Sequence, residues 1–183
     1  IYPVLSKKSD LEEYFHNKER NSEKNNFELL GFHFKNESPF LVKHFKDLIE
    51  ITDHTLSDNE PQSLNIARKQ CQSIRCALSV ILGKEESLKA LYLLDKYRFN
   101  VSPLKYNETQ NFTSADLDLI LETMSLIPPH LLPLQDIQQL SHSHKDAKRP
   151  DNEYAVSSIE LYHSLDKGTT EQKKYILFHE IAH

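Results

Sequence analysis

Glycine is scarce in this chain: only 3 of its 183 residues are glycine, whereas 8 are proline. Glycine supplies the positive φ angles of tight turns and the close backbone approach of phosphate-binding loops. The scarcity therefore argues against Gly-rich phosphate loops, dinucleotide-binding folds and turn-dense all-β folds. It favours helices joined by loops that proline and asparagine mark, so we expect a mostly α fold.

Charge and hydropathy argue against two classes of partner. The chain has 22 Lys+Arg against 27 Asp+Glu and a net charge of -5, so we expect no basic surface for nucleic acid. No apolar run approaches the roughly 18 residues that cross a bilayer, so we also expect no membrane span.

The cysteines and the glycosylation sequences leave alternatives open. Cys71 and Cys76 are either a local disulfide or two ordinary buried thiols. A spacing of five does not stack on a regular helix, so a disulfide would need a bend. The Asn-x-Ser/Thr sequences carry little weight because Asn, Ser and Thr are abundant here. They begin at Asn36, Asn100, Asn107 and Asn111.

The first half of the chain shows helical periodicity. Residues 1–30 are charged and Asn-rich, and we interpret them as a solvated helix or arm. Apolar residues three and four apart then predict a helix from residue 39 to about 52 and a second one over 64–82, which Gly83 closes. A third helix is expected over 85–97.

The pattern changes after a predicted linker at residues 100–112, which has little periodicity. Thr113 and Asp116 fit a capping box, and the helix that follows them ends before Pro128. Apolar residues at helical spacing follow the box, which supports this assignment.

The last part of the chain combines extended segments with a helix. Residues 134–144 and 154–163 alternate in the way of strands, and a polar loop joins them. Thr169 and Gln172 then open a final helix. We therefore expect an α+β arrangement with a small sheet in this C-terminal part.

That final helix ends in the sequence His-Glu-Ile-Ala-His, which matches the pattern HExxH. His179 and His183 are four apart, so both imidazoles project from one helical face and can share a metal ion. A zinc ion there would act as a Lewis acid and lower the pKa of a water molecule, and Glu180 would take the proton of that water as general base. The motif predicts hydrolysis of peptide bonds.

Residues 113–183 resemble the front half of the zincin class of metallopeptidase domains, which share the order helix, strand, antiparallel edge strand and HExxH helix. The runs 117–132, 159–161 and 178–183 are also similar to the lethal-factor-like metallopeptidase domains. The resemblance implies that His179 and His183 are zinc ligands and that Glu180 is the catalytic base. It also implies that the strand over 155–163 offers an open edge to an extended substrate.

The resemblance leaves a third zinc ligand to be found. Zincins take it from a later helix or loop, so we expect it downstream of the motif, in a longer chain than these residues. Upstream, His142 and His144 alternate on a predicted strand and His163 closes the next one, but all are most simply interpreted as solvent-exposed polar residues. Asp95 is interpreted as an ordinary charge at a helix edge.

Taken together, the residues predict a zinc-dependent endopeptidase. Residues 1–111 would form a helical N-terminal domain or propeptide, and residues 112–183 the N-terminal half of a zincin-like catalytic domain. Export to the periplasm or the outside of the cell is expected from the habits of such proteases and from the missing start Met. The alternatives are a non-catalytic helical interaction module and an inactive zincin fragment.

Overall fold

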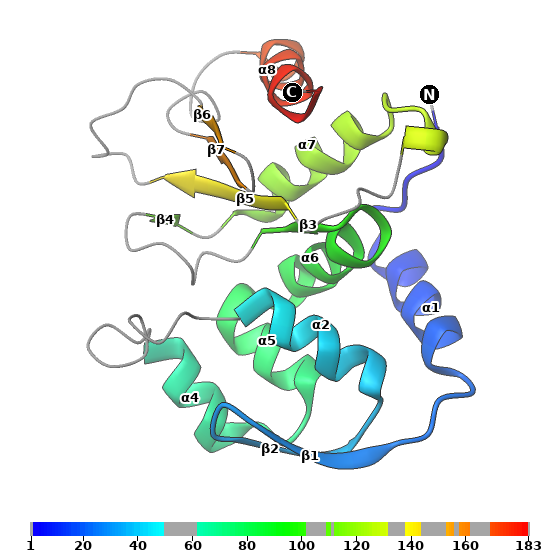
Figure 1. The fold of residues 1–183 in the computed structure, drawn as a ribbon, viewed down its shortest axis with the longest axis vertical. Coiled ribbons are helices and arrows are strands. Elements are labelled where there is room, and N and C mark those ends of the chain that lie inside the picture. Colours follow the sequence, from blue (N-terminus) through cyan, green and yellow to red (C-terminus); the bar gives the residue numbers. More distant parts are fainter. Residues whose placement is uncertain are drawn as a thin grey trace.

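The architecture is mostly helical, with a hairpin at one end and a small sheet towards the other. The computed structural model describes residues 2–49, 62–101, 109–110, 112–131, 138–143, 153–155, 158–161 and 169–182. Figure 1 shows the hairpin at the bottom, a layer of helices above it, and the sheet with the last two helices at the top. The predicted mostly α, α+β class is confirmed at this level.

The helices make up most of the described chain. They are α1 (Lys8–Glu19), α2 (Pro39–Ile49), α4 (Gln62–Gln70), α5 (Ile74–Leu82), α6 (Lys84–Tyr97), α7 (Ser114–Met124) and α8 (Thr170–Ala182), with a short 3₁₀ helix, η2 (Pro129–Leu131). The described helices include none that is both long and apolar enough to cross a membrane.

Side-chain caps fix where these helices begin. The Ser38 hydroxyl accepts a hydrogen bond from the Leu41 N–H at 3.3 Å, so α2 starts beside a serine. The capping box predicted at Thr113 and Asp116 is confirmed, because each side chain accepts the backbone N–H of the other residue. Gly83, at φ 105°, ends α5 as predicted, in a conformation that a residue with a side chain rarely adopts.

The single helix predicted over 64–82 is instead the pair α4 and α5, separated by a bend. Ser73 caps α5 by accepting from the Cys76 N–H at 3.2 Å. Cys71 and Cys76 form a disulfide across this bend, with their Cα atoms 5.5 Å apart. The bend thus supplies the geometry that a regular helix would deny to cysteines five residues apart.

The N-terminal part is not purely helical, which corrects the prediction. Strands β1 (Asn25–Leu29) and β2 (Phe32–Glu37) form an antiparallel hairpin. Leu30 and Gly31 both have positive φ, as in the turns that suit the twist of a two-residue hairpin loop. Phe32 and Phe34 are buried, and each packs edge-on against Phe45 of α2, with ring centroids 5.2 and 5.1 Å apart.

The second sheet is formed by β3 (Phe99–Asn100), β4 (Thr109–Gln110), β5 (Gln138–Ser143), β6 (Glu153–Ala155) and β7 (Ser158–Leu161). β5 pairs in parallel with β3 and β7 and antiparallel with β4, while β6 pairs antiparallel with β7. Two of these strands lie at the margins of the predicted linker. Asn100 is fully buried, and its amide donates to the backbone oxygen of Asp47 at 2.7 Å, which ties the sheet to α2.

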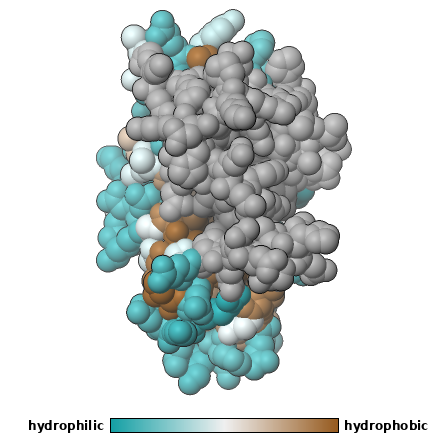
Figure 2. Space-filling model, turned by 90° about the vertical axis from the view of Figure 1, so that its left-hand side faces the viewer, coloured by the Kyte–Doolittle hydropathy of each residue, from teal (hydrophilic) through white to brown (hydrophobic). Residues whose placement is uncertain are grey.

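One hydrophobic core runs through the described residues, from Leu11 to Leu177. Leu11 and Phe15 of α1 belong to it, so the predicted solvated arm is in part a packed helix. On the face drawn in Figure 2, hydrophilic residues cover most of the coloured surface, and hydrophobic ones gather just above the hairpin end. The core has members on both sides of residue 111, and the predicted division into two domains at that point stays a prediction.

Candidate metal centre

The helix α8 carries the first part of the predicted zinc motif. The predicted capping box is confirmed: Thr169 N–H donates to the Gln172 side chain at 2.9 Å, and Gln172 N–H donates to the Thr169 hydroxyl at 3.2 Å. The helix then continues to Ala182 and contains His179 and Glu180. His183 lies outside the described residues, so the pairing of the two imidazoles stays a prediction.

One side of α8 is fixed against α7. Leu177 is fully buried in the core, and Ile181, one turn later, packs against that core. The Lys174 ammonium pairs with the Glu122 carboxylate of α7 at 2.8 Å. Burial and this ion pair together orient the helix about its own axis, since Lys174, Leu177 and Ile181 follow the three- and four-residue spacing of one face.

The opposite side of α8 is exposed and carries His179, the first histidine of the motif. His179 follows Leu177 by two residues, about 200° around the helix, and its side chain is exposed. The ring of Tyr175 lies nearly parallel to the imidazole, with centroids 6.5 Å apart and 25° between the planes. Glu180 is half-buried. An exposed imidazole and a nearby carboxylate suit a metal ligand and a general base, so this donor set fits zinc in kind.

The described residues do not complete a metal site. No group of three or more His, Cys, Asp or Glu side chains in the part of the chain that the structure describes could hold a metal ion. Of the upstream candidates, His142 lies in β5, where its backbone pairs with Gln110 and Leu161. His144 and His163 lie outside the described residues.

The strand predicted over 154–163 is two strands, which changes the open edge of the sheet. β7 is paired on both sides, with β5 at Leu140↔Ile159 and with β6 at Tyr154↔Ile159. The backbone of Ile159 therefore has strand neighbours on both sides and cannot offer an open edge. β6, Glu153–Ala155, lies at one end of the described sheet, opposite β3, and it runs antiparallel to its neighbour β7.

A second polar cluster was not predicted at all. Asp95, in the last turn of α6, accepts hydrogen bonds from His44 Nε2 at 2.9 Å and from the Tyr14 hydroxyl. The Lys18 ammonium lies 3.8 Å from the same carboxylate. Asp95 is thus the centre of a network between three helices, and the interpretation as an ordinary edge charge was wrong. Its partners come from distant parts of the sequence, so no local pattern could have indicated them.

The environment of Asp95 shifts its acidity. Burial alone would raise the pKa of its carboxyl, but the hydrogen bonds from His44 and Tyr14, with the charges of His44 and Lys18, lower that pKa below its ordinary value. Burial, and then the hydrogen bond to Asp95, raise the pKa of the Tyr14 phenol. The cluster is therefore a carboxylate held in its charged form next to a neutral phenol.

Comparison of this chain with models of protein families, with curated proteins and with solved structures gives no match. The functional conclusion therefore depends on the residues and their geometry.

Proposed function

We propose that the protein is a zinc-dependent endopeptidase of the HExxH type. His179 and His183 would bind the zinc ion, with a third protein ligand from outside the described residues. The observation that carries the proposal is the orientation of α8: Leu177 fixes one face in the core, and His179 lies exposed on the opposite face. The resemblance of residues 113–183 to the front half of zincin domains supports the same function.

The chain's own residues have distinct roles in this proposal. A zinc ion, when bound, supplies Lewis acidity and lowers the pKa of a water molecule. Glu180 takes up the proton of that water and later delivers it to the leaving amine. Lys174, paired with Glu122, and Leu177 hold the helix so that Glu180 keeps its position during the reaction.

The substrate proposed for this site is an extended peptide segment of a protein. β6, Glu153–Ala155, pairs with only one strand, β7, among the residues that the structure describes, so its other side can add a further strand. Main-chain hydrogen bonds of this kind recognise any peptide, so the choice between sequences would come from side-chain pockets.

Export of the protein also belongs to this proposal. Disulfides form and persist in oxidising compartments and are rare in reducing ones. The disulfide between Cys71 and Cys76 supports a periplasmic or extracellular location for the chain.

The variant Glu180→Gln tests the function directly. We expect cleavage of a quenched fluorescent peptide library to fall by about 100-fold or more, because a general base contributes at least about that factor. Zinc content, measured by native mass spectrometry, should stay at one ion per chain, because the two histidines are intact. The matched control is Glu171→Gln on the same helix, whose side chain is 86% exposed and should leave cleavage unchanged.

Two results would overturn the proposal. One is a Glu180→Gln variant that cleaves peptides as fast as the wild-type protein. The other is a wild-type protein that, supplied with zinc, neither binds the ion nor cleaves peptides, which would favour the non-catalytic helical module instead.

A further inference from the structure

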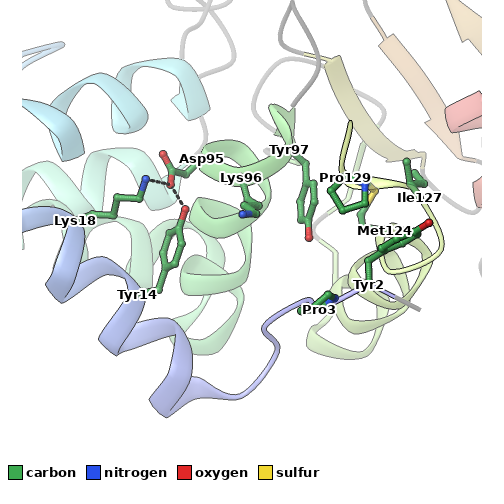
Figure 3. Close-up of a pocket in the computed structure, with 10 residues that line it drawn as sticks. All are labelled: Tyr2, Pro3, Tyr14, Lys18, Asp95, Lys96, Tyr97, Met124, Ile127 and Pro129. Atoms are coloured by element: carbon green, nitrogen blue, oxygen red, sulfur yellow. Dashed lines mark hydrogen bonds and ion pairs between the residues drawn. The ribbon is translucent and has the colours of Figure 1, made fainter. Parts of the chain in front are cut away.

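A pocket of about 430 Å³ lies at the junction of four parts of the chain, away from the zinc motif. Its walls come from the N-terminal segment, α1, the last turn of α6 and the end of α7 with the residues that follow it. Figure 3 shows that the two ends of this pocket differ in chemistry. Its volume is within the range of pockets that enclose small organic molecules.

One end of the pocket is polar and contains the Asp95 network. The Asp95 carboxylate already accepts from His44 and Tyr14 and pairs with Lys18. Figure 3 shows Tyr14 and Lys18 directed at this carboxylate. Since the carboxylate is occupied by partners of the protein itself, it is a poor acceptor for a further ligand, and its negative charge is compensated locally.

Lys96 supplies the charge that is available to a ligand. It lines the same pocket, its side chain is exposed, and it has no ion pair or hydrogen bond with any residue that the structure describes. The two lysines and one aspartate of the lining leave a net charge of +1. The end of the pocket near Lys96 is therefore complementary to an anion.

The other end of the pocket is apolar. Met124 and Ile127 are buried, and Pro129 begins η2 beside them. Tyr2 lies against the same wall in Figure 3, and its backbone N–H is held by the Ser125 oxygen at 2.8 Å. This wall can cover a hydrocarbon or aromatic body and remove it from water.

We propose that this pocket binds a small organic acid, a carboxylate attached to an apolar body. The carboxylate pairs with Lys96, and the apolar body lies against Met124, Ile127 and Pro129. None of these residues belongs to α8, so the site is distinct from the proposed zinc centre and its occupancy does not depend on peptidase activity.

The helix ends at the pocket favour a cation, which competes with the preference of Lys96 for an anion. α6 and α7 both end here, and the C-terminus of a helix carries a partial negative charge of about half a unit, which favours cations. Lys96 stands in the last turn of α6 and offsets that charge there. The full charge of Lys96 exceeds the partial charge of either helix end and lies closest to the ligand that it pairs with, so we expect an anion to be preferred. The sign of the bound ligand tests this directly.

The experiment compares three probes of one shape: 4-phenylbutyrate, the neutral 4-phenylbutanamide and the cationic 4-phenylbutylamine. Binding is measured by isothermal titration calorimetry without zinc, using the Glu180→Gln variant, so that a failed peptidase proposal leaves the result unaffected. We expect the carboxylate to bind with a Kd of about 1 mM or tighter, and more tightly than the amide or the amine.

Two single variants connect this binding to the pocket. Lys96→Gln should weaken carboxylate binding about tenfold, because it removes one charge-assisted contact. The control is Lys69→Gln, because Lys69 is exposed on α4 and does not line the pocket. This change should leave the affinity for the carboxylate unchanged. Three results would each overturn the proposal: tighter binding of the amine, absence of carboxylate binding, or equal affinity of the Glu180→Gln protein with and without the Lys96→Gln change.

Discussion

At the residue scale, the Asp95 carboxylate is a partly buried charge that we expect to contribute to the stability of the fold. Its side chain is only 12% exposed and has three partners on two neighbouring helices. Asp95→Asn removes the charge that His44, Tyr14 and Lys18 surround. We expect the free energy of unfolding at neutral pH to fall by about 1–3 kcal/mol, the usual cost of leaving buried polar partners unsatisfied. Urea unfolding measures this difference, and Glu12→Gln, at an exposed position of α1, serves as control.

The same group predicts a pH dependence. The pKa of Asp95 is lowered in the folded protein, so its contribution is fully present above the ordinary value of about 3.9 and is lost as the pH falls through the lower folded-state pKa. The gap in stability between wild-type and Asp95→Asn proteins should therefore narrow below about pH 4. If this difference in unfolding free energy is as large below about pH 4 as it is at pH 6, the assignment is contradicted.

At the element scale, the disulfide between Cys71 and Cys76 joins α4 to α5 across their bend. Closing so short a loop lowers the conformational entropy of the unfolded chain, which stabilises the folded protein by about 2 kcal/mol. A reducing agent should lower the Tm by about 4–8 °C, the shift expected for a chain of this length. The variant with both Cys71→Ala and Cys76→Ala should have the same Tm with and without the reducing agent. If the reducing agent lowers the Tm of this variant as much as that of the wild-type protein, the disulfide is not the cause of the shift.

The elements differ in how well sequence predicts them, for physical reasons. Caps such as Thr113 with Asp116 depend only on near neighbours, so α7 and α8 begin where predicted. The hairpin is stabilised by contacts of Phe32 and Phe34 with Phe45, and its turn, Leu30-Gly31, lacks the usual asparagine or aspartate. Long-range packing thus overrode a charged, Asn-rich local sequence.

The candidate site divides in the same way. The spacing of His179, Glu180 and His183 is a local property of one helix, and sequence alone could indicate it. The edge of the sheet depends on which strands pair, and Asp95 depends on residues 51 and 81 positions away in sequence. Neither could be predicted without the tertiary arrangement.

At the scale of the whole molecule, Leu177 connects the proposed catalytic helix to the rest of the fold. It is the member of the buried core that α8 contributes among the described residues. Leu177→Ala should cost about 2–5 kcal/mol, because it leaves a cavity between α8 and the core. Phe178→Ala, at a side chain that is 38% exposed, should cost about 0.5 kcal/mol. Urea unfolding compares the two, and similar losses would show that α8 is held by other contacts.

The burial of Asn100 limits where this protein can be made. Asn100 begins the sequence Asn-Val-Ser, which the oligosaccharide-transferring enzymes of a eukaryotic secretory pathway recognise. An oligosaccharide is bulky and needs water around it, whereas the Asn100 amide is enclosed and bonded to the Asp47 backbone. The fold described here therefore requires an unmodified Asn100. In a cell that attaches a glycan to it, the chain could not form the hydrogen bond from Asn100 to Asp47 that joins the sheet to α2.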